Sequence, residues 1–394
     1  MIYLDNNATT RVAPEVYEAM QPYLTEVYGN PSSAHSLGQR MKSAVEHARE
    51  QVADLIGATD PGEIVFTSCG SESDNWAIGG FLEQNPGRRH IVTTRVEHEA
   101  VRNLCEHLSE IECEVTWLDV NESGELNLDD LRKALRRDTG IVSVMLANNE
   151  TGVLFPIEEI GKIVRDNSDA VFHVDGVQAV GKIPIDLKNL EVDLFALSGH
   201  KLHAPQGIGA LYIRDGVKLP PFIIGGSQER GRRGGTSAVP NIVGLGAACE
   251  LAKNSANHEH VQLLRNKLED TILKEIPNAR LNGASERTKR LPNTANISFE
   301  YVEGENILVH LDKAGVMVST GSACHSTTKQ SSPTLRAMNV PYTAAQGSIR
   351  FSLGRYNTEE EIDYTLEVLP AIIDKLVEMS PYDKELKALY AGRA

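Results

Sequence analysis

Short apolar runs alternate with helical stretches from residue 64 to residue 213, and this alternation restricts the fold more than any other feature of the sequence. The apolar runs have the length of strands, and the stretches between them have helical periodicity. The runs are 64–67, 90–94, 115–118, 141–147, 171–174, 193–197 and 208–213. Such a βαβ alternation is typical of a mostly parallel sheet with helices on its faces. Because ligands of these sheets bind at the carboxyl ends of strands, the polar residues after the runs are the candidate site.

The pattern changes near residue 255. Beyond it we predict helices over 257–275, 305–313 and 358–378, and strands over 293–299 and 349–353. Thr358 has the N-cap position of the last helix, and Glu361 the capping-box position. We therefore predict a large domain over 15–255. A smaller α+β domain would be formed by 1–14 and 256–394 and would carry the loop around Cys324.

The charge of the chain argues against a nucleic-acid-binding protein. The formal net charge is −15, from 39 basic and 54 acidic residues, whereas nucleic acid requires a basic face. The first residues lack the pattern of a signal or transit peptide, and no apolar run has membrane-spanning length, so we expect a cytoplasmic protein. The five cysteines are scattered without a Cys-x-x-Cys pair, which is typical of a reducing compartment and of chains without disulfides or a structural metal.

Lys201 is the most informative polar residue. It ends the sequence Ser198-Gly199-His200-Lys201, a turn between the last two apolar runs. Burial lowers the pKa of a lysine and makes its neutral amine a nucleophile, as Schiff-base formation requires. The alternative is a lysine whose stem lies along the surface while its charge reaches solvent.

Three further groups follow strand ends. Gly70 and Ser71 stand between a strand and a helix, where backbone N–H groups and a hydroxyl can bind phosphate, or where the turn is a simple N-cap. Asp175 could pair with a protonated pyridine nitrogen, as in pyridoxal sites, or could be an ordinary capping aspartate. His98 could stack on a planar ring and exchange protons, or could be a polar loop residue.

Three segments of the second half also have candidate functions. The glycine-rich basic loop 228–236 could close over an anion, join a subunit contact, or be a solvated charged face. Cys324 stands among small residues before a polar stretch, which is typical of a reactive thiol. The alternative is an exposed cysteine without a function. Arg350 lies on a predicted strand and could bind a substrate carboxylate or form a surface salt bridge.

Seven motifs occur in a fixed order along the chain. They are Tyr3-Leu4-Asp5-Asn6-Asn7-Ala8-Thr9-Thr10, Gly29-Asn30-Pro31-Ser32-Ser33, Val96-Glu97-His98, Asn148-Asn149-Glu150-Thr151-Gly152, Asp175-Gly176-Val177-Gln178-Ala179, Ser198-Gly199-His200-Lys201 and Gly321-Ser322-Ala323-Cys324. From residue 3 to about 365 the chain resembles the cysteine desulfurases, class-V aminotransferase-like enzymes that depend on pyridoxal phosphate. Segments 66–70, 200–205, 228–233 and 349–353 are similar to the nitrogen-fixation, NifS-like type. The resemblance implies the α/β fold type I of pyridoxal-phosphate transferases, with a mixed, mostly parallel sheet flanked by helices and a smaller α+β domain.

The resemblance also implies a role for each residue near the cofactor, pyridoxal 5'-phosphate. Lys201 would hold it through a Schiff base, and His98 would stack on its ring and help to move protons. Asp175 would pair with the ring nitrogen, and Gln178 with the phenolic oxygen. The residues implied in phosphate binding are Gly70, Ser71, Ser198 and His200, with Thr236 reaching in from a second subunit of a homodimer.

The remaining implied roles concern L-cysteine and its sulfur. Asn149, beside the cofactor, and Arg350 would hold the substrate carboxylate. Cys324 would accept the sulfur, which gives L-alanine and a persulfide. An iron–sulfur scaffold protein would then receive the sulfur, for nitrogenase or for general cluster supply. The resemblance implies no metal ligand, no nucleic acid and no membrane partner.

Alternatives remain open at this point. Another fold-type-I enzyme, such as an aminotransferase or a selenocysteine lyase, would keep the cofactor residues, and an aminotransferase would not need Cys324. A non-catalytic sulfur carrier would need Cys324 but not Lys201. The chain also departs from many relatives at Ser71, where threonine is common, at 325 and 327–330, and in the tail beyond 381. The last two departures leave partner docking open.

Overall fold

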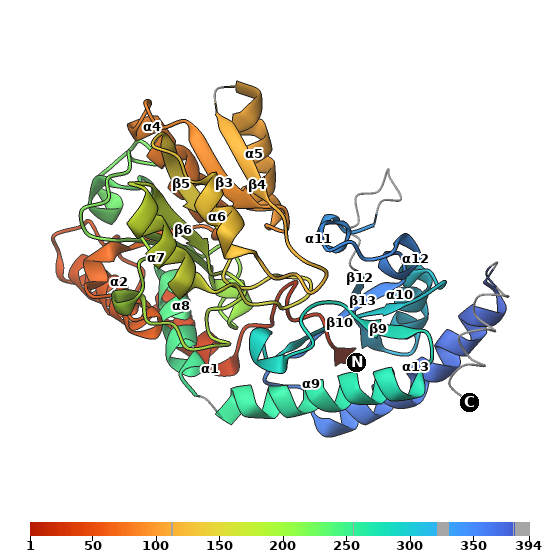
Figure 1. The fold of residues 1–394 in the computed structure, drawn as a ribbon. Coiled ribbons are helices and arrows are strands. Elements are labelled where there is room, and N and C mark those ends of the chain that lie inside the picture. The colour runs from red at the N-terminus through yellow and green to blue at the C-terminus, as the bar shows by residue number, and fades with distance from the viewer. Residues whose placement is uncertain (112, 255, 321–330, 381, 383–394) are drawn as a thin grey trace.

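The computed structural model of the chain describes residues 1–111, 113–254, 256–320, 331–380 and 382. Helices surround a large central sheet in one part of the molecule, and a second, smaller sheet lies beside two long helices in the other (Figure 1). Each part has an apolar core of its own.

The large sheet has seven strands. In spatial order they are β2 (Ile64–Thr67), β8 (Gly209–Ile213), β7 (Leu194–Ser198), β6 (Val171–Asp175), β5 (Thr139–Ser143), β3 (His90–Thr94) and β4 (Glu114–Leu118). β8 runs antiparallel to both of its neighbours, and the other neighbouring pairs are parallel. The prediction of a mixed, mostly parallel sheet is confirmed.

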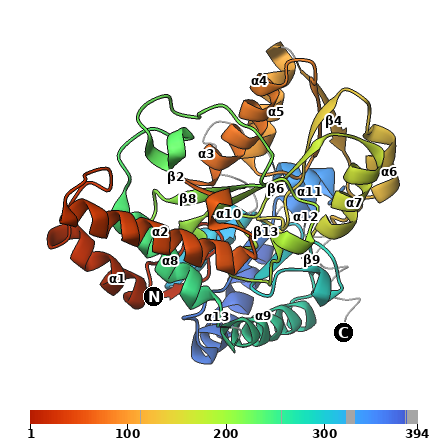
Figure 2. The same cartoon turned by 90° about the vertical axis from the view of Figure 1, so that its left-hand side faces the viewer.

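Helices cover both faces of this sheet. Ile64 and Phe66 belong to one core and Val65, between them, to another, because successive side chains of a strand point to opposite faces. The first face carries α1 (Pro14–Thr25), α2 (Ser36–Ile56), α6 (Leu128–Ala134), α7 (Ile157–Asn167) and α8 (Val239–Ala252); α1, α2 and α8 form one group in Figure 2. The opposite face carries α3 (Gly70–Asn75), α4 (Phe81–Gln84) and α5 (Glu99–Ile111). Because helices bury both faces of the sheet, the strands have apolar side chains at successive positions and not in alternation.

Two elements differ from the sequence-based prediction. The apolar run 141–147 was expected to be one strand, but β5 ends at Ser143. Val144, Met145 and Ala147 lie beyond this end but are buried as the strand residues are. The backbone there still bonds to β6, because Val144 N donates to the His173 oxygen at 3.1 Å, and Ala147 forms an isolated bridge with Leu154. The helix expected over 72–82 is interrupted by a π-helical turn, Trp76–Gly80, between α3 and α4.

The smaller sheet is antiparallel. Its strands, in spatial order, are β12 (Ser319–Thr320), β13 (Ser348–Ser352), β10 (Thr294–Phe299) and β9 (Ala279–Leu281). The nearby helices are α9 (Ala256–Glu275), α10 (Gly304–Lys313), α11 (Pro333–Ala337), α12 (Tyr342–Ala345) and α13 (Glu359–Glu378). Thr358 and Glu361 form the predicted capping box at the start of α13. Within the described residues, no helix is both long and apolar enough to cross a membrane.

The N-terminal segment joins this smaller part. β1 (Ile2–Tyr3) pairs in parallel with β11 (Val316–Met317), and Leu4 is buried in the same core as α9 and α13. The segment then passes toward the large sheet, where Thr10 N donates to the carbonyl oxygen of His200. The predicted domain limits at residues 15 and 256 stay a prediction.

Candidate active site

A cavity of about 360 Å³ lies at the carboxyl ends of the parallel strands, where ligands of such sheets bind. It is bounded by residues at or beyond the ends of β2, β3, β5, β6 and β7, by the N-terminal segment, and by one residue of β13. The predicted site residues that line it are Gly70, Ser71, His98, Asn149, Asp175, Gln178, Ser198, His200, Lys201 and Arg350. The fold therefore brings together residues from both sheets.

Lys201 lies in a 3-10 turn directly after β7, between two fully buried strands. Its Nζ donates to the backbone oxygens of Asn7 at 2.6 Å and Ala8 at 2.7 Å. Burial, followed by the positive charge of Arg350, lowers the pKa of Lys201 to about 8, against the opposing charges of Asp5 and Asp175. The amine therefore points inward, and the alternative of a lysine that extends into solvent does not describe it.

Asp175 is the last residue of β6 and is only 6% exposed. Its Oδ1 accepts from the backbone N–H of Val177 at 2.9 Å. Burial raises the pKa of Asp175, and the charges of His98 and Lys201 oppose that rise. The next residue must be a glycine, because a Cβ on Gly176 would lie 1.9 Å from the ring of Phe195. A carboxylate in this position is stabilised when a cationic group occupies the cavity.

The turn after β2 leaves polar groups free at one end of the cavity. α3 begins at Gly70, and the N-cap residue Cys69 makes no side-chain cap, so the first N–H groups of the helix are available. Ser198 Oγ is buried and has no hydrogen-bond partner among the described residues. Nδ1 of His200 lies 3.1 Å from Thr9 Oγ1, and burial lowers the pKa of His200 to about 4. The N–H groups of α3, the Ser198 hydroxyl and the neutral His200 ring can therefore bind an anion through hydrogen bonds alone, with no ion pair.

Arg350 extends from β13 into the cavity with its side chain only 10% exposed. Its Nη1 donates to the backbone oxygen of Asn149 at 3.0 Å, and its Nη2 to Oδ1 of Asp5 at 2.9 Å. Its Nε is buried without a partner among the described residues. The alternative of a surface salt bridge is therefore wrong.

Asp74 is a site residue that the sequence did not reveal. It lines the cavity, is 1% exposed, and its Oδ1 lies 3.4 Å from Nε2 of His173. Burial raises the pKa of Asp74 well above its usual range, with the charges of Asp175 and Glu97 adding to the rise. A carboxyl group that keeps its proton reduces the negative charge beside Asp175. The sequence signal for Asp74 was an acidic residue within the helix that follows the turn at Gly70 and Ser71.

Asn7 is a second residue that we missed. Its backbone oxygen accepts from Lys201 Nζ and from Gln178 Nε2, the latter at 2.9 Å. Its Nδ2 donates to Thr294 Oγ1 at 2.9 Å, and its Oδ1 accepts from Lys182 Nζ at 3.1 Å. Asn7 therefore joins the N-terminal segment to both sheets. The sequence signals were the polar cluster after the first apolar residues and the place of Asn7 in the first of the seven motifs.

Comparisons with known proteins agree with this site. The class-V aminotransferase family model matches residues 2–365. The cysteine desulfurase of Trichormus azollae is 55% identical over 388 residues, which cover 98% of this chain and 96% of that protein. The chain belongs to the cysteine desulfurase family. The cysteine desulfurase NifS of Azotobacter vinelandii is 50% identical over 383 residues, covering 97% of this chain and 94% of that protein. A solved structure of a NifS-like protein matches with a TM-score of 0.89 at 41% identity, covering 95% of this chain and 100% of that one.

Cysteine desulfurases of this class use pyridoxal phosphate, and the cavity fits that cofactor. The unpartnered Ser198 Oγ and the first N–H groups of α3 are donors that a phosphate can accept from. A Cβ on Gly70 would lie 2.7 Å from Val177 Cγ2, so the backbone at this end of the cavity is closely packed. Lys201 and Asp175 line the same cavity. The amine of Lys201 can attack the aldehyde of the cofactor, and the carboxylate of Asp175 can accept a hydrogen bond from its ring nitrogen.

Two expected desulfurase residues are not among the described residues that line the cavity. Cys324 lies outside the described residues. Thr236 is exposed and does not line the cavity. The loop that carries Thr236 is held in place by a buried ion pair, in which Glu229 Oε2 accepts from Arg49 Nη1 at 2.7 Å. The backbone of Glu229 is left-handed, with a φ of 48°. The alternative of a wholly solvated charged loop is therefore wrong for Glu229.

Proposed function

We propose that the chain is a pyridoxal-phosphate-dependent cysteine desulfurase that converts L-cysteine into L-alanine and leaves a persulfide on Cys324. The observation that carries this function is the convergence of Lys201, Asp175, His98 and Arg350 on one cavity. Bound pyridoxal phosphate supplies an electron sink for the carbanion at the substrate Cα.

Each residue of the cavity would have a separate task. Arg350, with Asn149, would bind the substrate carboxylate, because a guanidinium offers paired donors in a plane. Lys201, as a free amine of lowered pKa, would take the α-proton. Asp175 would keep the ring nitrogen protonated, and His98 would lie on the ring face and exchange protons. Gly70, Ser71, Ser198 and His200 would hold the phosphate.

Cys324 would complete the reaction as a nucleophile. Its thiolate would attack the substrate sulfur, so that an S–S bond forms while the Cβ–S bond breaks. The electron pair of the broken bond passes to the carbon skeleton, which takes up protons and leaves as alanine. The persulfide would then pass to an acceptor, which we propose to be an iron–sulfur scaffold protein in the cytoplasm.

We also propose a homodimer in which Thr236 contributes to the phosphate site of the partner subunit. Thr236 is exposed and absent from the cavity of its own chain. Arg233 Nε donates to Glu72 Oε1 at 2.9 Å, so the same loop is tied to the helix that begins at the phosphate turn. A loop fixed in this way could present Thr236 across a subunit interface.

The function is tested by a spectrum, an alanine assay and mass spectrometry on the purified protein. The wild type should show a cofactor absorption band, release alanine from L-cysteine, and gain one sulfur on Cys324. Lys201→Ala should lose the band and all turnover. A protein without the band would be a sulfur carrier, and turnover with the extra sulfur on another residue would overturn the role of Cys324.

A further inference from the structure

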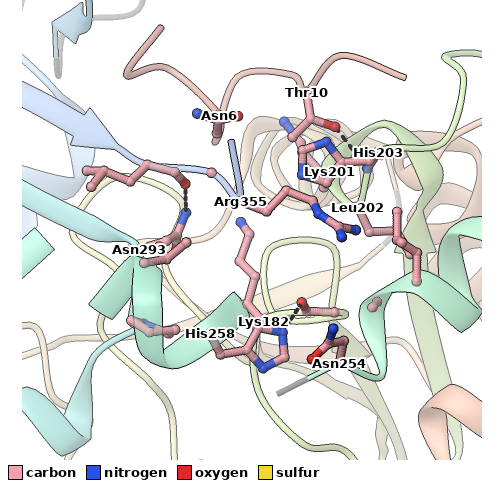
Figure 3. Close-up of a pocket in the computed structure, with 17 residues that line it drawn as sticks. Asn6, Thr10, Lys182, Lys201, Leu202, His203, Asn254, His258, Asn293 and Arg355 are labelled. Atoms are coloured by element: carbon pink, nitrogen blue, oxygen red, sulfur yellow. Dashed lines mark hydrogen bonds between the residues drawn. The ribbon is translucent and has the colours of Figure 1, made fainter. Parts of the chain in front are cut away.

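Lys182 lines a second cavity, which shares Lys201 with the active-site cavity. The smaller cavity, of about 70 Å³, is lined by Lys182, Lys201 and Arg355, among others (Figure 3). Lys182 follows Gln178 by four residues in the turn after β6. Its Nζ donates to Oε1 of Gln178 at 2.9 Å and to Oδ1 of Asn7 at 3.1 Å. The amine therefore contacts two residues that line the active-site cavity.

Neighbouring backbone carbonyls identify which atom of each amide is the nitrogen. Nε2 of Gln178 faces the backbone oxygen of Asn7, which can only accept, so the amide must place its nitrogen on that side. Nδ2 of Asn7 faces the backbone oxygen of Asn149 at 3.3 Å, which fixes the second amide in the same way. Both amide oxygens are thus turned toward Lys182, which donates to each.

Charge pairing does not explain this position of a lysine. Among the described residues that line the smaller cavity there is no aspartate or glutamate. Burial, together with the positive charges of Lys201 and Arg350, lowers the pKa of Lys182 well below its usual range. The environment therefore disfavours the charged amine, and the two amide oxygens are the partners that hold it.

We propose that Lys182 is a positioning residue that holds the Gln178 amide with its oxygen turned away from the active-site cavity. Gln178 is buried, at 6% exposed, and lines that cavity. One of its two N–H groups donates to the backbone oxygen of Asn7, and the other would be available to the phenolic oxygen of the cofactor. Without a donor at Lys182, Oε1 of Gln178 becomes a buried acceptor without a partner, and the amide gains from turning toward another donor. The inference rests on the proposed function.

The test uses the holoenzyme and the pH midpoint of its cofactor absorption band. A hydrogen bond to the phenolic oxygen stabilises the cofactor form that has lost a proton, so its loss should raise the midpoint. We expect Lys182→Met to raise it by about half a pH unit or more and to lower kcat about tenfold, with KM for L-cysteine changed less than about twofold. Lys182→Arg keeps a donor and should restore part of both values. Lys188→Met, at an exposed lysine, is the matched control and should leave the midpoint unchanged.

Gln178→Leu and the double variant separate hydrogen bonding from charge. If Lys182 acts through Gln178, the double variant should move the midpoint no further than Gln178→Leu alone. Additive shifts, or a wild-type midpoint in Lys182→Met, would overturn the inference. Lys182→Gln keeps one donor without the charge, so it should leave the midpoint near the wild-type value even if Lys182→Met fails to fold, and a midpoint as high as that of Gln178→Leu would overturn the inference. A wild type without the absorption band would overturn the function itself, which is a distinguishable result.

Discussion

Arg350 and Asp5 form an ion pair at 2.9 Å between β13 and the N-terminal segment. Asn149 accepts a second hydrogen bond from Arg350, so the guanidinium is held in one orientation before any substrate binds. A fixed guanidinium loses less conformational entropy when it binds a carboxylate. This pair is therefore the part of the site on which substrate affinity should depend most.

Arg350→Ala should weaken the use of L-cysteine more than the binding of the cofactor. The loss in kcat/KM should correspond to about 2–4 kcal/mol, because removing one partner of a buried charged pair leaves the other unpaired. Steady-state kinetics and cofactor titration measure the two effects separately. Arg350→Lys keeps the charge without the planar fork and should recover only part of the loss. Unchanged kinetics would place the carboxylate elsewhere.

The capture of pyridoxal phosphate by the apoenzyme should depend on pH through Lys201. Only the neutral amine attacks the aldehyde, and the lowered pKa of Lys201 is about 8. The capture rate should therefore rise with pH and level off above about pH 8, instead of above about 10 as for an ordinary lysine. Asp5→Asn should lower this midpoint, because the negative charge of Asp5 raises the pKa of Lys201. Stopped-flow absorbance measures the rate, and a midpoint near 10 would contradict the burial argument.

Asp175→Asn should retain some cofactor but lose most activity. A neutral ring nitrogen is a poorer electron sink, and an asparagine cannot stabilise the protonated nitrogen by charge. Asp175→Glu, which keeps the carboxylate, should retain more activity than Asp175→Asn. The alanine assay compares the variants at equal cofactor content. Near-normal turnover in Asp175→Asn would argue decisively against the pairing.

Cys324→Ala should divide the reaction into two halves. The variant should bind the cofactor and change its absorption when L-cysteine is added, because the cavity residues are intact. It should release essentially no alanine and carry no persulfide. Cys105 and Cys249 should not replace it, because burial raises the pKa of both thiols far above the usual range. Catalytic release of alanine by this variant would show that another group accepts the sulfur.

The sequence by itself determined the fold class and the kind of chemistry. The alternation of apolar runs and helices predicted the mostly parallel sheet. Lys201 was identified because it stands between two strand-length runs. These features depend on residues close together in the chain, whose backbone preferences and periodicity act locally.

Only the tertiary structure decided which distant residues meet. Asp5 and Arg350 are separated by 345 positions, and Lys182 and Asn7 by 175, and no periodicity connects them. The end of β5 at Ser143 was also undetermined, because Met145 and Ala147, which lie beyond it and line the cavity, are buried and apolar like the residues of the strand. The lowered pKa of Lys201 depends on the same packing, since desolvation and the charge of Arg350 act through space. Local sequence specifies elements, whereas burial and proximity arise only when separate elements pack together.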